Sequence, residues 1–167
     1  MAWYQGTVSF PYIPGLLTFD QRVTSGREAP LVLQAWERLH HFPDLIFVDG
    51  QGIAHPRSMG IAAHLGLLLD TPAIGCAKTP LVGGDPPLEN RRGASAPLFY
   101  QERKVGAALK KRPGVKPLYC SPGHRIDLHV ALQLVLEACR GYRIPEPLRK
   151  AHMRANQLRS SRTSACP

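Results

Sequence analysis

The stretch that most restricts the fold is DLIFVDG, residues 44–50, a continuous apolar run that ends at Asp49. A run of this kind, without polar alternation, is typical of a strand that is covered on both faces. MGIAAHLGLLLD at 59–70 then predicts a helix, and PAIGCAK at 72–78 predicts a second strand. This order, followed by a predicted hairpin and helix, indicates an α/β fold with a mixed β-sheet flanked by helices.

The other predicted elements follow from apolar periodicity and from the positions of proline and glycine. They are a helix at 27–41, a long loop at 81–97, two strands joined by a turn at 104–123, a helix at 125–142 and an extended arm at 143–152. We expect one domain over residues 1–155 and a basic, disordered tail over 156–167. The four cysteines lack the spacing of a zinc site, and we expect reduced, mostly buried thiols.

The net charge of the chain restricts the kind of molecule that it could bind. The 21 Lys and Arg residues exceed the 12 Asp and Glu residues, which gives a formal net charge of +9. Such a balance suits a polyanion, nucleic acid above all, although a soluble protein with a basic tail would show the same excess. No apolar run is long enough to span a membrane, and the N-terminal residues lack the pattern of a signal peptide, so we expect a cytoplasmic protein.

Candidate functional residues gather where the predicted strands end. Asp49 ends one strand and Lys78 the next, and sites in α/β sheets form at the carboxyl ends of strands. A carboxylate such as Asp49 suits a hard cation such as Mg²⁺. Glu28 could be its partner, or could stabilise a helix N-terminus. Lys78 could neutralise a phosphate, or be an ordinary solvated charge.

Three histidines are weaker candidates. His124 lies in SPGHRID, where a loop is expected to give way to a helix. There it could position a water or contact a phosphate, or it could be an ordinary residue of a cap region. His55 and His64 have poor spacing for a metal, so supporting or structural roles are favoured for both. From residue types alone, the chain is a basic α/β domain that could be a metal-dependent enzyme acting on phosphate esters.

Five motifs taken in order add a resemblance. They are PYIPG, REAPLVLQAWERL, PDLIFVDGQGIAHPRSMGIAAHLGLLLDTPAIGCAK, KPLYCSPGHRIDL and GYRIPEPLRKA. Together, over roughly residues 5–151, they resemble the endonuclease V family, which has an RNase H-like fold. The resemblance implies a Mg²⁺-dependent endonuclease, with Mn²⁺ as a substitute, that recognises deoxyinosine and cuts the second phosphodiester bond 3′ to it, leaving a 3′-hydroxyl and a 5′-phosphate.

The resemblance also implies roles for individual residues. It makes Asp49 and Glu28 metal ligands, and it adds His124 and Lys78 to the catalytic set, with His55 in support. The wedge that enters the duplex corresponds to Pro11, Tyr12, Ile13 and Pro14. The pocket for the flipped base corresponds to Gly15, Gly50, Gly52, Gly60 and Ile61. Extruding a base costs a few kcal/mol, and least for a poorly paired one.

Two departures from the family pattern matter. The chain begins near the family's third strand, so the first strands and the metal-binding aspartate that they carry have no counterpart, and the sequence resembles a fragment or an incomplete copy. Seven residues, 20–26, also separate Phe19 from Arg27 and Glu28, where the family has a continuous motif. Aligning Asp20 or Gln21 with the glutamate is an alternative, but everything after Glu28 aligns without a gap.

These departures leave more than one function open. The first is an active nuclease of DNA repair acting on deoxyinosine-containing DNA, or alternatively on inosine-containing RNA. The second is a non-catalytic protein that binds inosine sites without cutting them, and the third is a poorly folded remnant. The motifs GYRIPEPLRKAH and SPGHRID look closer to bacterial members, which favours DNA. The family is typically monomeric, and we expect a monomer.

Overall fold

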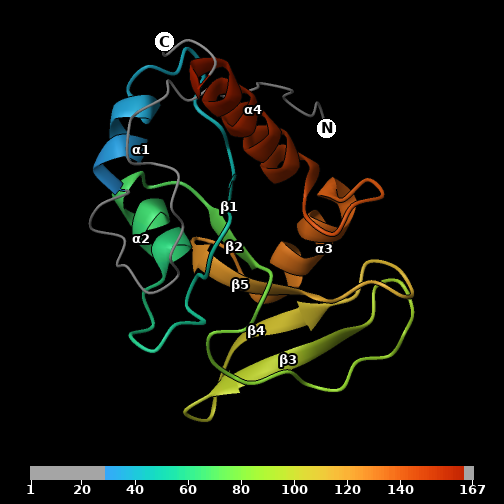
Figure 1. Cartoon of the computed structure of the whole chain (residues 1–167). Coiled ribbons are helices and arrows are strands. Elements are labelled where there is room, and N and C mark those ends of the chain that lie inside the picture. The colour runs from blue at the N-terminus through green and yellow to red at the C-terminus, as the bar shows by residue number, and fades with distance from the viewer. Residues whose placement is uncertain (1–28, 164–167) are drawn as a thin grey trace.

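The computed structural model describes residues 29–163, with side chains through Gln157. Within this range helices and strands alternate as far as β2, and three further strands and then two helices follow (Figure 1). They are α1 (Ala29–Trp36), β1 (Ile46–Val48), α2 (Ile61–Leu68), β2 (Ala73–Ala77), β3 (Ser95–Tyr100), β4 (Arg103–Leu109), β5 (Leu118–His124), α3 (Leu128–Ala138) and α4 (Glu146–Thr163).

The strands form one mixed sheet in the order β1-β2-β5-β4-β3. The strands β1 and β2 are parallel, with Phe47 opposite Ile74, and all other neighbours are antiparallel. The parallel pair is joined through α2, as a parallel connection requires. The expected α/β class with a mixed sheet is therefore confirmed.

Helices cover both faces of the sheet (Figure 1). Because side chains alternate along a strand, Ile74 and Cys76 face one side while Ala73 and Gly75 face the other. On the first side, Ala131 and Val135 of α3 complete a core of fully buried residues. On the second side α2 lies so close to the sheet that a Cβ added at Gly66 would lie 2.7 Å from the Cβ of Ala73.

The strongest predicted helix begins at a clear capping residue. The carboxylate of Asp127 accepts hydrogen bonds from the backbone N–H groups of His129 and Val130, at 2.8 and 3.0 Å. These bonds satisfy two of the donors that a helix leaves free at its N-terminus. As a result α3 starts at Leu128 rather than at residue 125, and it fixes one wall of the core.

Two elements differ from the predictions. The strand β3 starts at Ser95, inside the segment predicted as a loop, because pairing with β4 overrides the propensity of Pro97. The arm predicted at 143–152 is helical from Glu146, where Pro147 occupies the first turn, as proline is able to do. This helix continues through the boundary expected at 156, so the predicted disordered tail is helical as far as Thr163.

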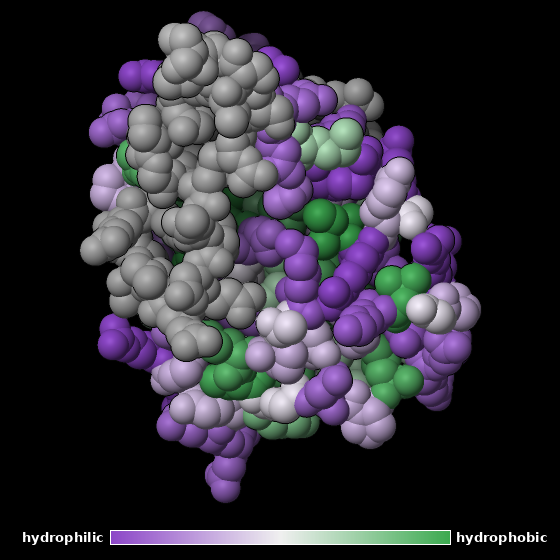
Figure 2. All heavy atoms as spheres, in the orientation of Figure 1, coloured by the Kyte–Doolittle hydropathy of each residue, from purple (hydrophilic) through white to green (hydrophobic). Residues whose placement is uncertain are grey.

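The surface is mixed in polarity. In the orientation of Figure 1, hydrophilic residues surround small groups of apolar ones (Figure 2). Large apolar side chains that are exposed, such as Phe42 and Phe99, come from distant parts of the chain. None of the helices within residues 29–163 combines the length and the apolar character needed to cross a membrane.

Candidate nuclease site

Asp49 and Lys78 form an ion pair at one edge of the sheet. The Nζ of Lys78 donates a hydrogen bond to the Oδ2 of Asp49 over 3.0 Å. The side chain of Asp49 is 38% exposed and that of Lys78 is 46% exposed, so both remain open to a ligand. Asp49 and Lys78, which were expected at the ends of successive strands, therefore lie together, and their roles toward a metal ion and a phosphate stay predictions.

The parallel pairing of β1 and β2 explains why Asp49 and Lys78 are in contact. Asp49 is the first residue after β1, Lys78 is the first after β2, and the carboxyl ends of parallel strands lie at the same edge. Arg143 holds this edge in place. Its guanidinium donates hydrogen bonds to the backbone oxygens of Lys78 and Pro117, and burial lowers the pKa of Arg143.

Gln51 belongs to the same edge and was missed in the sequence. Its Nε2 donates to the backbone oxygen of Thr79 at 3.1 Å, one residue beyond Lys78. Its Oε1 is buried and has no hydrogen-bond partner among the described residues. A buried acceptor without a donor is costly, which marks Gln51 as a group that a ligand could satisfy. A polar residue between Gly50 and Gly52 was the available signal.

Of the residues expected to form the base pocket, Gly50, Gly52, Gly60 and Ile61 lie in the described part of the chain, and these four come together. The backbone N–H of Gly60 donates to the oxygen of Gly52 at 2.8 Å. A Cβ at Gly50 would lie 2.6 Å from Cγ2 of Ile61, whereas one at Gly52 would lie 2.0 Å from the oxygen of Pro122. The Cβ positions at Gly52 and Gly60 are thus filled by the protein's own backbone. These glycines allow the loop to pack against β5, and their contact with a base stays a prediction.

His124 does not join this edge. It is the last residue of β5 and pairs with Ala73 at the beginning of β2, whereas Lys78 follows the end of β2. Its Nε2 lies 3.4 Å from Oδ1 of Asp70, which also pairs with Arg125. The expected position at a helix N-terminus is wrong as well, since Asp127 caps α3. His124 therefore has no described contact with Asp49 or Lys78.

His55 lies in the turn that follows the glycine loop. Its Nδ1 accepts a hydrogen bond from the backbone N–H of Arg57 at 3.2 Å. Partial burial, helped by the charge of Arg57, lowers the pKa of the imidazole and favours its neutral form. The ring thus supports its own turn, and no described contact joins it to Asp49.

The remaining predicted residues lie outside the described range. They are Glu28, Gly15 and the wedge Pro11, Tyr12, Ile13 and Pro14. Between residues 29 and 157 no three His, Cys, Asp or Glu side chains cluster in a way that could hold a metal ion. In that part of the chain Asp49 supplies one carboxylate of the kind that Mg²⁺ binds.

The fold and the ion pair at the edge of the sheet together define an α/β protein with a charged site at the carboxyl ends of two parallel strands. A family model described as Endonuclease V matches residues 1–153, and the chain belongs to the endonuclease V family. It is 51% identical over 154 residues to an endonuclease V of Dehalococcoides mccartyi, a match that covers 92% of this chain and 66% of the relative.

Solved structures agree with this assignment. The chain matches endonuclease V of Streptomyces avermitilis with a TM-score of 0.78 and 43% identity, over 93% of this chain and 65% of that one. The Bacillus subtilis structure gives a TM-score of 0.81 at 33% identity over the same shares. An endonuclease V of Ciona intestinalis, solved with inosine-containing DNA, gives 0.58 at 25% identity over 79% of this chain and 60% of that one. The fold is thus the expected RNase H-like fold, and the chain spans just under two thirds of the length of the D. mccartyi relative.

Proposed function

We propose that this chain acts on inosine-containing nucleic acid as a metal-dependent endonuclease of DNA repair. The observation that carries the proposal is the Asp49–Lys78 pair at the carboxyl ends of β1 and β2, in a chain of the endonuclease V family. Deoxyinosine-containing DNA is the proposed substrate, because a Ciona intestinalis member of the family has been solved with DNA that contains inosine. The proposed cut is at the second phosphodiester bond 3′ to inosine, leaving a 3′-hydroxyl and a 5′-phosphate.

The proposed metal is Mg²⁺, with Mn²⁺ as a substitute, held by Asp49 together with Glu28. A hard cation bound by carboxylates lowers the pKa of water and stabilises charge on the leaving oxygen. Asp49 would supply a carboxylate oxygen directly. Lys78, released from Asp49 when the cation binds, would turn its ammonium toward the negatively charged phosphate.

A second candidate function follows from the same edge. The part of the chain that the structure describes offers Asp49 without a cluster of further metal-ligating side chains, and Lys78 already neutralises it. A protein that recognises inosine and does not cut would retain the basic surface and lose only the chemistry. This alternative predicts specific binding without nicking.

The test uses the purified chain with an end-labelled duplex that carries one deoxyinosine, with and without Mg²⁺. We expect a nick beyond the 3′ neighbour of inosine, and Asp49→Asn should abolish it. Asp44→Asn is the matched control, because Asp44 is an exposed carboxylate at the other end of β1. Full cleavage by Asp49→Asn would refute the site, and a shifted but uncut duplex with the unmodified chain would favour the second candidate.

A further inference from the structure

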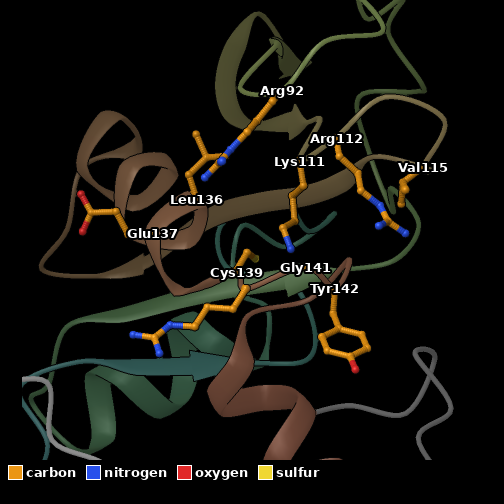
Figure 3. A pocket seen from close by; sticks show the side chains of 10 residues that line it. Arg92, Lys111, Arg112, Val115, Leu136, Glu137, Cys139, Gly141 and Tyr142 are labelled. Carbon is orange, nitrogen blue, oxygen red and sulfur yellow. The ribbon is translucent and has the colours of Figure 1, made fainter.

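A basic cavity lies at the same edge of the sheet as the candidate nuclease site, a few strands away. Its volume is about 410 Å³, and it is formed by the end of α3, the turn between β4 and β5, and the long loop before β3. Figure 3 shows Lys111 in the middle of the lining, with Arg92 on one side of it and Arg112 on the other. The charged residues of the lining are Arg92, Lys111, Arg112, Glu137 and Arg140.

Lys111 is the unusual member of this set. It is 9% exposed, and no carboxylate, carbonyl or hydroxyl of the described residues accepts a hydrogen bond from its Nζ. Its close partner is the thiol of Cys139, which is a weak acceptor. Burial raises the pKa of this thiol, and the charge of Lys111 and a hydrogen bond from it oppose the shift. Burying an ammonium without an acceptor costs free energy, which an anion bound in the cavity would recover.

The cavity lies at the same edge of the sheet as Asp49 and Lys78. Lys111 follows the end of β4, whose Leu109 pairs with Leu118, the first residue of β5. Antiparallel pairing of β5 with β2 places that end of β5 beside Lys78, and Arg143 bonds to both segments. With strands spaced by about 4.8 Å, Lys111 lies roughly 10 Å from Lys78 and roughly 15 Å from Asp49 along the edge.

We propose that this cavity binds a backbone phosphate of the nucleic-acid strand, outside the linkage that is cut. The inference rests on the proposed function, because it assumes that the same strand reaches Asp49. A phosphate offers anionic oxygens to one ammonium and to the forked guanidiniums around it.

The test measures the affinity of the Lys111→Met variant for an inosine-free strand and compares it with that of the unmodified chain. We expect affinity to fall about tenfold, as for loss of one charge-assisted hydrogen bond, and the salt dependence of binding to weaken by roughly one phosphate contact. Lys104→Met is the matched control, because Lys104 is exposed and lies near the other end of β4. The variant's melting temperature should stay equal or rise, since a buried unpaired charge is removed.

A second arm replaces the strand by inorganic phosphate, compared with chloride at equal ionic strength. We expect phosphate to raise the melting temperature of the unmodified chain and not that of Lys111→Met. Stabilisation by phosphate with an unchanged affinity for the strand would overturn the proposal in favour of a small free phosphate compound. No effect in either arm would overturn it outright. Because neither arm uses inosine or measures cutting, a failure of the proposed nuclease activity would show separately, in the nicking assay.

Discussion

The ion pair between Asp49 and Lys78 contributes little to stability. Both side chains are more than one third exposed, and pairs of this kind contribute about 0–1 kcal/mol. A structural role is therefore a weak explanation for a charged pair at the carboxyl edge of the sheet. Its position instead suits a ligand that competes for both charges.

Replacing Lys78 separates these two roles. We expect Lys78→Gln to change the free energy of unfolding by less than about 1 kcal/mol, because the pair is partly solvated. The rate of inosine-dependent nicking should fall at least roughly tenfold, since one charge-assisted contact to the phosphate is lost. Urea unfolding and initial rates measure the two effects. A large loss of stability with an unchanged rate would contradict the assignment.

Tyr119 provides a prediction about pH. Its hydroxyl donates to the Oδ1 of Asp85 at 2.6 Å, and burial together with this bond raises its pKa to about 12, from an ordinary value of 10.0. The folded state therefore holds the phenolic proton more tightly than the unfolded state. The stability that this supplies is complete below pH 10 and is lost as the pH rises toward 12. The loss amounts to roughly 2–3 kcal/mol at most.

The control for that prediction is Tyr119→Phe, which removes the titrating group. Between pH 9 and pH 12 the unmodified chain should lose more stability than the variant, with the difference growing above pH 10. Urea unfolding at each pH measures it, and the absorbance of tyrosinate reports the titration directly. Parallel curves for the two proteins would show that the hydroxyl of Tyr119 titrates normally.

At the scale of elements, the pairing of strands explains which residue positions the sequence predicted correctly and which it did not. Asp49 and Lys78 were predicted to end successive strands, and the parallel pairing of β1 and β2 through α2 brings those two ends together. His124 was expected where a loop gives way to a helix, but it ends β5, and the direction of that strand in the sheet cannot be read from its own residues. β5 runs antiparallel to β2, so the end of β5 lies at the opposite edge from Lys78.

The same reasoning covers β3 and α4. Pro97 and the glycine-rich residues before it are typical of a loop, and only pairing with β4 makes Ser95–Tyr100 a strand. The prolines at 145 and 147 indicated an extended arm, but proline also fits the first turn of a helix. After that turn, residues that favour helices continue α4 to Thr163.

The loop that follows β1 is an element whose shape depends on close packing. The N–H of Gly52 donates to Oγ of Ser121 at 2.7 Å, and a Cβ at Gly52 would meet the oxygen of Pro122 at 2.0 Å. We expect Gly52→Ala to cost about 2–3 kcal/mol through overpacking, and Ser121→Ala to cost about 1–3 kcal/mol through an unsatisfied buried N–H. Both should also reduce nicking, because this loop positions Asp49.

Gly114→Asn is the control for the loop. Gly114 also lacks a side chain and has a φ of +75°, but an added Cβ would meet nothing within 4 Å. Asn tolerates this left-handed conformation, so the variant should lose less than about 1 kcal/mol. Thermal or urea unfolding compares the three variants. Equal losses at Gly52 and Gly114 would mean that conformational freedom, rather than close approach, is what Gly52 supplies.

For the whole molecule, positive charge lies in elements close to the candidate site. The helix α4 carries five Lys and Arg residues and one Glu, and it contacts β1, which leads into Asp49. The basic cavity around Lys111 lies at the same edge of the sheet. Positive charge near a carboxylate site suits a substrate whose backbone is itself anionic.

This distribution predicts how binding depends on salt. Each phosphate that the protein neutralises releases counterions, so a fourfold rise in salt from 50 to 200 mM weakens duplex binding by about 3.5-fold per contact. Contacts at Lys78, at Lys111 and at one residue of α4 would together give roughly a 40-fold loss. Titrations of an inosine-free duplex at several salt concentrations measure this slope. Affinity that does not change with salt would mean that the net charge of +9 does not face the strand, and the nucleic-acid assignment would then depend on the family alone.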